Sequence, residues 1–167
     1  MNIKTKSNLI FAFFLFIIII LSYNFLTTET ASKNMARVFS TTWIDNITLL
    51  SSNIKENKAK LQNNYNVKHL VQLDLIPKDF NVYINNEDLE YSHIKADAGI
   101  RIYLKHNHNS MYLQLKNVTK ISCYYYSNGL RNNKIISNII INSIPLNQQS
   151  SDDINCNASN NIIELVI

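Results

Sequence analysis

The sequence predicts an α+β fold in which a long N-terminal helix packs against an antiparallel β-sheet. A helical spacing of apolar residues continues from Thr27 to Asn64 with no glycine or proline to interrupt it. After Ile76 and Pro77, the chain changes to short runs rich in β-branched residues or with period-two alternation, which are typical of strands. The 167 residues leave room for one modest globular domain beside the helix.

The first part of the expected helix is strongly apolar. Leu9 to Leu26 contains 18 residues, and no charge lies between Lys6 and Glu29. This is about the shortest helix that can cross a hydrocarbon core of roughly 30 Å. A cleaved signal peptide and a buried core helix are the alternatives, but bulky residues follow the run and the chain is too small to cover such a helix. We therefore predict a transmembrane half at 8–26, preceded by a cytoplasmic N-terminus or short leader at 1–7.

The second part of the helix, at 27–64, is amphipathic. Its apolar residues recur at spacings of three, four and seven, which places them on one face of a helix. They form a packing stripe that consists of Met35, Phe39, Trp43, Ile47, Leu50, Ile54 and Leu61. Because a lone helix cannot bury such a stripe, we expect the globular domain at 27–167 to lie along it. Two helices broken near Ser22–Thr30 are the alternative.

The sheet is expected within 65–167, after a short helical piece at Val67–Leu75. The closing run is too apolar to be left in solvent, so we predict a strand inside the sheet for it. A loop of His106, Asn107, His108 and Asn109 is expected to join two of the strands as a hairpin. The predicted strands are Phe80–Ile84, Ile100–Leu104, Met111–Leu115, Val118–Tyr126, Ile135–Ile141 and Ile162–Ile167.

The charge distribution predicts an orientation and gives no indication of a nucleic-acid partner. Lys4 and Lys6 precede the apolar run with no acid before Glu29, which predicts a cytoplasmic N-terminus and a periplasmic C-terminal domain in a bacterium. On that oxidising side, the two cysteines, Cys123 and Cys156, are expected to form a disulfide. The net charge of +4 is unclustered, so no nucleic-acid surface is predicted.

No catalytic, cofactor or metal site is predicted. His106 and His108 could face the same way on a strand, but zinc needs three or four ligands and no other histidine or acid has a supporting spacing. A nucleophilic Cys123 would need a placed histidine and an orienting group, and a disulfide with the second cysteine is expected instead. We therefore expect loop histidines in solvent, no cofactor and no enzymatic activity.

Four stretches resemble the type IVb group of type IV pilins, which includes conjugative thin-pilus pilins. Leu49 to Phe80 resembles the end of the pilin spine helix and the short segment after it, which closes here in Leu75-Ile76-Pro77-Lys78-Asp79. MYLQLKNVTKISCYYY resembles a strand, a link and the first cysteine. IIINSIPLNQQSSDDINC and CNASNNIIELVI resemble the strand and polar loop before the second cysteine, and the Asn-rich turn and closing strand after it.

The resemblance implies a structural subunit of a type IV(b) pilus or a related conjugation or secretion apparatus. Such a subunit would self-associate through its N-terminal helix and meet other pilins and assembly proteins, in the inner membrane or in an extracellular pilus. Prepilins normally have a glycine before the cleavage point and a glutamate five residues after it. Here the candidate cleavage lies between Ser7 and Asn8, and Ala12 stands at the glutamate's position. The alternative is a single-pass inner-membrane protein with a periplasmic binding or scaffold domain that never polymerises.

Overall fold

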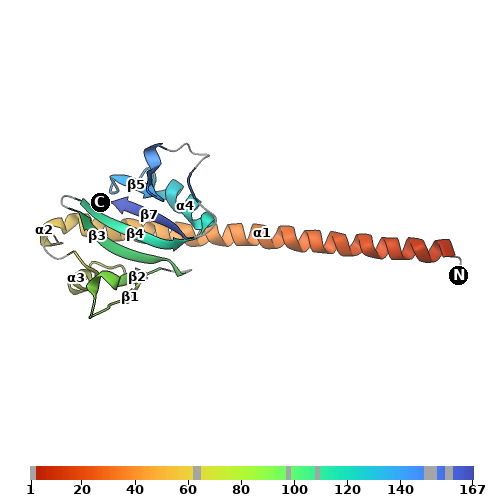
Figure 1. Ribbon diagram of the computed structural model, residues 1–167, viewed down its shortest axis with the longest axis horizontal. Helices are drawn as coiled ribbons and strands as arrows, with labels where there is room; N and C mark the ends of the chain where they lie inside the picture. Colours follow the sequence, from red (N-terminus) through yellow and green to blue (C-terminus); the bar gives the residue numbers. More distant parts are fainter. Residues whose placement is uncertain (1–2, 62–64, 97–98, 108–109, 149–153, 157–159) are drawn as a thin grey trace. The chain divides into compact units, whose positions relative to one another are not determined.

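The computed structural model describes residues 3–61, 65–96, 99–107, 110–148, 154–156 and 160–167 (Figure 1). The chain divides into two units. The first unit is Met1–Ala36 and the second is Arg37–Ile167. The helix α1, Ile3–Glu56, contributes to both units and includes the residues at which the sequence also allows a break. Within the described part of the chain, no helix combines the length and the apolar character that a membrane crossing requires. The transmembrane role of 8–26 stays a prediction.

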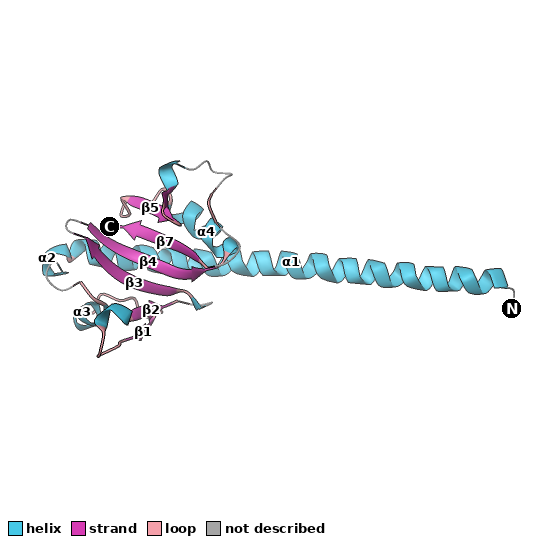
Figure 2. Ribbon diagram, viewed as in Figure 1, coloured by secondary structure: helices cyan, strands magenta, loops and turns pink. Residues whose placement is uncertain are grey.

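The second unit combines helices with one antiparallel sheet, as the sequence predicts (Figure 2). The described strands form a seven-stranded sheet in the order β1-β2-β3-β4-β7-β5-β6. The C-terminal strand β7 pairs with β4 on one side and β5 on the other, so the prediction that the chain closes inside the sheet is confirmed. The strands are β1 Asn81–Tyr83, β2 His93–Lys95, β3 Arg101–Asn107, β4 Ser110–Val118, β5 Asn138–Ile141, β6 Ile144–Pro145 and β7 Asn161–Val166.

The apolar stripe of α1 supplies one side of the hydrophobic core. Trp43, Ile47, Leu50 and Ile54 are buried, while Arg37 and Asp45 on the opposite face are exposed. The side chains of Met35 and Phe39 lie outside the described ones. The sheet supplies the other side through alternate residues of its central strands, which all point to one face. These inward residues are Ile102, Leu113, Leu115, Ile139, Ile141, Ile163 and Leu165.

Hydrogen bonds from α1 hold the loops on both of its flanks. Asn53 Nδ2 donates to the backbone carbonyl of Leu75 at 2.8 Å, which fixes the segment that leads into β1. On the other flank, Asn133 Nδ2 donates to Thr48 Oγ1 at 2.8 Å, and Lys55 Nζ donates to the Ile135 carbonyl at 3.2 Å. The helix is therefore the element to which the irregular parts of this unit are tied.

The sequence predicts that the helix ends at Asn64, but α1 already ends at Glu56, and Asn57 separates it from the next helical turn. The side chain of Asn57 donates to the Asn53 carbonyl at 2.9 Å and so competes with the helical backbone for that acceptor. A separate turn of helix follows as α2, Lys58–Leu61, and it returns Leu61 to the core as the stripe predicts. Residues 62–64 lie outside the described residues. The short helix α3, Val67–Gln72, begins after the N-cap Asn66, whose side chain accepts from the His69 amide.

The strand predicted for Val118–Tyr126 is wrong beyond Val118, because the segment forms the helix α4, Lys120–Leu130. Thr119 caps this helix by accepting from the Ser122 amide at 3.2 Å. The buried residues Cys123, Tyr126, Ser127 and Leu130 then recur at helical spacing. The run of isoleucine and tyrosines suggested a strand, and Thr119, as a candidate N-cap, is the sequence signal that could have indicated the helix instead.

The sequence did not predict β2 or β6, which are strands of only three and two residues. β5 and β6 are joined by Asn142 and Ser143, whose φ angles are +48° and +72°. Positive φ at both central residues is the geometry of the two-residue hairpin turn that matches strand twist, and asparagine tolerates it better than most residues. The 3-10 turns are η1, Leu89–Tyr91, and η3, Leu146–Gln148.

We predict that Gly129 cannot accept a large side chain, because α4 approaches α1 closely there. A Cβ at this position would overlap Cδ1 of Ile44, which is packed against the core. Gly129→Leu is expected to lower the free energy of unfolding by about 1–3 kcal/mol despite the better helix propensity of leucine. Denaturant unfolding of the full chain in detergent, followed by fluorescence of the buried Trp43, measures this.

Asn128→Leu is the matched control, since it adds the same side chain one residue earlier. Ile44→Ala combined with Gly129→Leu should recover part of the loss, because it opens the space that leucine needs. Strictly additive losses in the double variant would show that the two positions do not meet.

Candidate functional site

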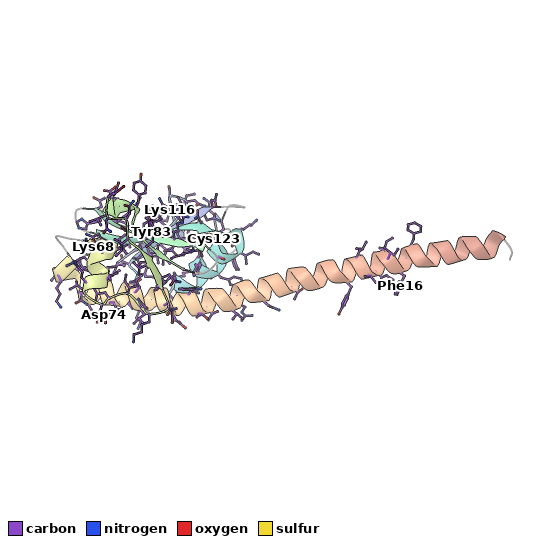
Figure 3. The ribbon with its side chains drawn as sticks, turned by 90° about the horizontal axis from the view of Figure 1, so that it is seen from below. Phe16, Lys68, Asp74, Tyr83, Lys116 and Cys123 are labelled. Atoms are coloured by element: carbon purple, nitrogen blue, oxygen red, sulfur yellow. A yellow bond between two sulfur atoms is a disulfide. The ribbon has the colours of Figure 1, made fainter. Side chains whose placement is uncertain are left out.

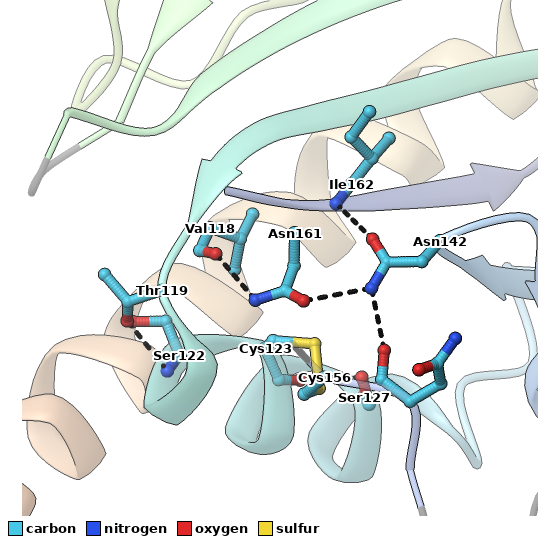
Figure 4. Close-up of a disulfide and its surroundings, with 10 residues drawn as sticks. Val118, Thr119, Ser122, Cys123, Ser127, Asn142, Cys156, Asn161 and Ile162 are labelled. Carbon is cyan, nitrogen blue, oxygen red and sulfur yellow. Dashed lines mark hydrogen bonds between the residues drawn. A yellow bond between two sulfur atoms is a disulfide. The ribbon is translucent and has the colours of Figure 1, made fainter. Parts of the chain in front are cut away.

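The Cys123–Cys156 disulfide is present and joins α4 to the segment that leads into β7 (Figure 4). The Cα atoms lie 5.9 Å apart, and 33 residues separate the cysteines in the sequence. Cys123 is fully buried in the first turns of α4, and not in a strand as its neighbours suggested. The described residues contain no free cysteine, so a nucleophilic thiol has no place here.

Two asparagine side chains next to the disulfide form a hydrogen-bond network (Figure 4). Asn161 is completely buried, and its Nδ2 donates to the Val118 carbonyl at 3.0 Å. Its Oδ1 accepts from Asn142 Nδ2 at 3.0 Å, and the same Nδ2 donates to the Asn155 carbonyl at 2.7 Å. Asn142 Oδ1 accepts in turn from the Ile162 amide at 3.0 Å. The network therefore connects the end of β4, the β5–β6 turn, the Cys156 segment and the start of β7.

The face of the sheet away from α1 carries one straight row of side chains, which we call the outer row. Register pairs Tyr83 with His93, Tyr103 with Gln114, Gln114 with Glu164, and Glu164 with Ile140. The His93 ring connects the first two pairs, with its centroid 5.0 Å from that of Tyr83 and 5.3 Å from that of Tyr103. Lys116 Nζ lies 4.7 Å from the Tyr103 ring centroid, which is a cation–π contact.

A cavity of about 670 Å³ opens at the edge of β3. The outer row contributes Tyr103 and Gln114 to its lining, η1 contributes Tyr91, and the segment after α2 contributes Tyr65. Burial raises the pKa of the Tyr65 hydroxyl above its usual value, so this group stays protonated and donates to the Tyr112 carbonyl at 3.3 Å. Tyr65 thus forms a fixed wall of the cavity.

Of the two histidines predicted to lie in a loop, the structure places His106 in a strand. His106 is an exposed residue of β3, and its ring centroid lies 6.5 Å from that of Tyr65. His108 lies outside the described residues, as do the side chains of Ser7 and Asn8 at the candidate cleavage point. Among the described residues, no group of three or more histidine, cysteine or acidic side chains is arranged to hold a metal.

The first unit displays a continuous apolar surface on the N-terminal part of α1. Phe16, Ile19 and Leu21 are about 60 % exposed, and Figure 3 shows Phe16 projecting from the helix. Because consecutive helical residues point in different directions, apolar side chains face all sides of the helix here. The described exposed residues of this surface are Phe14, Leu15, Phe16, Ile18, Ile19, Ile20, Leu21 and Tyr23.

The fold is similar to that of a solved type IVb pilin. The crystal structure of type IV b pilin from Salmonella typhi matches with a TM-score of 0.54 and 16 % sequence identity. The match covers 74 % of this chain and 97 % of the pilin chain. No protein-family model matches the sequence, and no curated protein matches it. At this identity the likeness concerns the fold, and it confirms the pilin-like fold that the four sequence stretches indicate.

We predict that Asn161→Leu destabilises the second unit more than its small change in volume would suggest. The substitution removes the donor to the Val118 carbonyl and the acceptor for Asn142 Nδ2. Each buried group left without a partner costs about 1–3 kcal/mol. Asn147→Leu, on the exposed turn η3, is the control and should change the free energy of unfolding by less than about 0.5 kcal/mol. Equal stability of the two variants would contradict the role of the network.

We also predict that Cys156→Ser lowers the free energy of unfolding by about 2–5 kcal/mol, since the disulfide closes a long loop. Residues 124–167 should become sensitive to protease in the folded protein. Reduced wild type and the Cys123→Ser/Cys156→Ser variant should show the same decrease in the free energy of unfolding. Equal decreases would show that the loss comes from the missing bond and not from altered side-chain packing. Rapid alkylation of both thiols in native, unreduced protein would show that the bond does not form.

Proposed function

We propose that this chain is a structural subunit of a type IV(b) pilus or a related conjugation or secretion apparatus, and that it assembles through the N-terminal part of α1. On assembly, the apolar helices of neighbouring subunits form a shared core, and the sheet domain faces outward. Before assembly, the same apolar segment anchors the subunit in the bacterial inner membrane with the second unit in the periplasm. The role is structural, with no catalysis and no cofactor.

The observation that carries the proposal is the exposed apolar surface of residues 14–23. A helix that is apolar on all sides is stable in water only when something else covers it, either lipid or other helices. A surface of this kind on an isolated chain indicates an interaction site. The pilin-like fold supports the same interpretation, because a pilin is a subunit of a filament.

Self-association explains both properties of α1 together. The part in the second unit is amphipathic and buries its stripe against its own sheet, whereas the described residues 14–23 of the first unit are almost all apolar and mostly exposed. If α1 served only to pack against the sheet, it would not need the apolar residues that precede Ala36. These residues therefore serve a partner outside the chain, for which a second copy of the same helix is suited in chemistry and length.

We predict that a charge within the apolar surface abolishes assembly. Ile19→Lys would place an ammonium in an apolar environment, where an unpaired charge is strongly unfavourable. The variant should be absent from the sheared filament fraction of cells that assemble wild-type subunits, while the second unit keeps its disulfide. Immunoblots of sheared and cell-bound fractions, run without reductant, measure both.

Ile162→Lys is the matched control, because Ile162 is an exposed isoleucine on the outer face of the sheet. It should reach the sheared fraction normally. If wild-type protein stays entirely in the inner membrane while cells assemble filaments, the proposed role is wrong. That result would favour the non-polymerising membrane protein with a periplasmic scaffold domain.

A further inference from the structure

A second row of side chains lies beside the outer row on the same face of the sheet. Register pairs Lys95 of β2 with Arg101 of β3, and Arg101 with Lys116 of β4. We call these three cations the basic row. Lys95 and Arg101 are exposed, and Lys116 is half-buried. Directly opposite residues have Cβ atoms only about 4.5–5.5 Å apart, so three positive charges lie side by side on three adjacent strands.

The basic row is electrostatically unfavourable for the isolated chain. Like charges directly opposite each other destabilise a sheet. The outer-face positions of β1 to β4 that the structure describes contain no acid. On the next strand, β7, Glu164 already accepts from Gln114 Nε2 at 2.6 Å. An anionic ligand would remove the repulsion, so the basic row favours a polyanion as partner.

Aromatic rings alternate with the cations on this face. Along β3 the outward residues are Arg101, Tyr103 and Lys105, with apolar inward residues between them. On β2, the ring of His93 precedes Lys95 by two residues, so it has the same outward direction. Cations that track a phosphate backbone, combined with rings on which bases stack, are typical of proteins that bind single-stranded nucleic acid. A polyanion without bases would use the cations and leave the rings without a function.

Tyr83 provides a ring that a base can reach. It lies on the edge strand β1 at the end of the outer row, and it is 54 % exposed. Its ring contact within the described part of the chain is with His93 at 5.0 Å between centroids, which leaves the other side of the ring accessible. Lys95 is its diagonal neighbour across the β1–β2 pair. A base stacked on Tyr83 would therefore place its phosphate near the basic row.

An acid at the other end of this surface limits where the ligand lies. Glu90, on the exposed turn η1, borders the same cavity as Lys105 and Lys116. Its carboxylate repels phosphate there, so the backbone of a bound strand is expected to follow Lys95 and Arg101.

We propose that the outer face of β1, β2 and β3 binds single-stranded nucleic acid. Lys95 and Arg101 bind phosphates, and a base stacks on Tyr83. The sequence gave no indication of this surface, because its residues come from three strands and alternate with inward residues. The inference concerns the second unit alone and does not depend on filament assembly.

Fluorescence anisotropy of a labelled oligothymidylate tests the proposal on the oxidised full chain in an uncharged detergent. We expect saturable binding at low salt, with the logarithm of the affinity falling linearly against the logarithm of the salt concentration. A duplex of the same length should bind at least about threefold more weakly, because its bases cannot reach Tyr83. Inorganic polyphosphate, a polyanion without bases, should compete less well than unlabelled oligothymidylate at equal phosphate concentration.

The cation variants test the phosphate contacts. Lys95→Gln and Arg101→Gln should each weaken binding by at least about threefold and lower the salt slope by about one. Lys58→Gln is the matched control, because it removes the same charge from an exposed position on α2, and it should bind nearly as wild type does. Glu90→Gln should strengthen binding, since it removes the repelling carboxylate.

The ring variants test the base contact. Tyr83→Ala should weaken binding several-fold without a change in the salt slope, because stacking releases no counterions. Tyr124→Ala is the control, since Tyr124 is a comparably exposed tyrosine on α4.

The proposal is overturned if the oligonucleotide does not bind saturably at low salt, or if Tyr83→Ala binds as wild type does. It is also overturned if Lys58→Gln weakens binding as much as Lys95→Gln and Arg101→Gln do. Duplex and polyphosphate that bind as tightly as the single strand would contradict it as well, because they would indicate a surface for any polyanion.

Discussion

The structure depends on one constraint, which is that the amphipathic part of α1 cannot bury its own apolar stripe. Ile47, Leu50 and Ile54 are completely inaccessible to solvent only because the sheet lies along the helix. The sheet also needs a partner to cover its apolar inner face, because its inner residues alternate along each strand with the largely polar outer row. The C-terminal strand β7 lies between β4 and β5, so the last residues of the chain complete the surface on which the stripe packs. This arrangement makes the core a product of contacts between distant parts of the sequence.

Where regular structure is sparse, covalent and polar links replace packing. The region between β4 and β7 contains a short helix, two short strands and the segment of Cys156, and few of these elements could bury enough surface to be stable alone. The disulfide fixes that segment to α4, and the side chains of Asn142 and Asn161 connect four pieces of backbone beside it. Asn161 satisfies the buried carbonyl of Val118, which would otherwise lack a partner, and Asn142 bonds the Asn155 carbonyl and the Ile162 amide.

The sequence was informative where a pattern is local. The stripe from Trp43 to Leu61 follows from helical periodicity, and β1, β3, β4, β5 and β7 each contain or overlap a predicted strand. The prediction failed at Val118–Tyr126, because β-branched and aromatic residues have similar patterns in short strands and in buried helices. The outer row and the cavity could not be predicted, since they depend on strand register and strand order, which bring Tyr83, Gln114 and Glu164 together from separate parts of the chain. The disulfide could be predicted from the sequence because the chain has only two cysteines to pair.

The central claim is that α1 has two roles, one for its own sheet and one for neighbouring copies of the chain. Site-specific crosslinking tests the second role directly: Ile18→Cys introduces a thiol into the exposed apolar surface, and Ile162→Cys introduces one on the sheet. Both variants keep the native disulfide. After mild oxidation of assembled filaments, the account predicts covalent dimers for Ile18→Cys in a non-reducing gel. Filaments that contain Ile18→Cys subunits but yield only monomers, while Ile162→Cys subunits crosslink, would contradict the account.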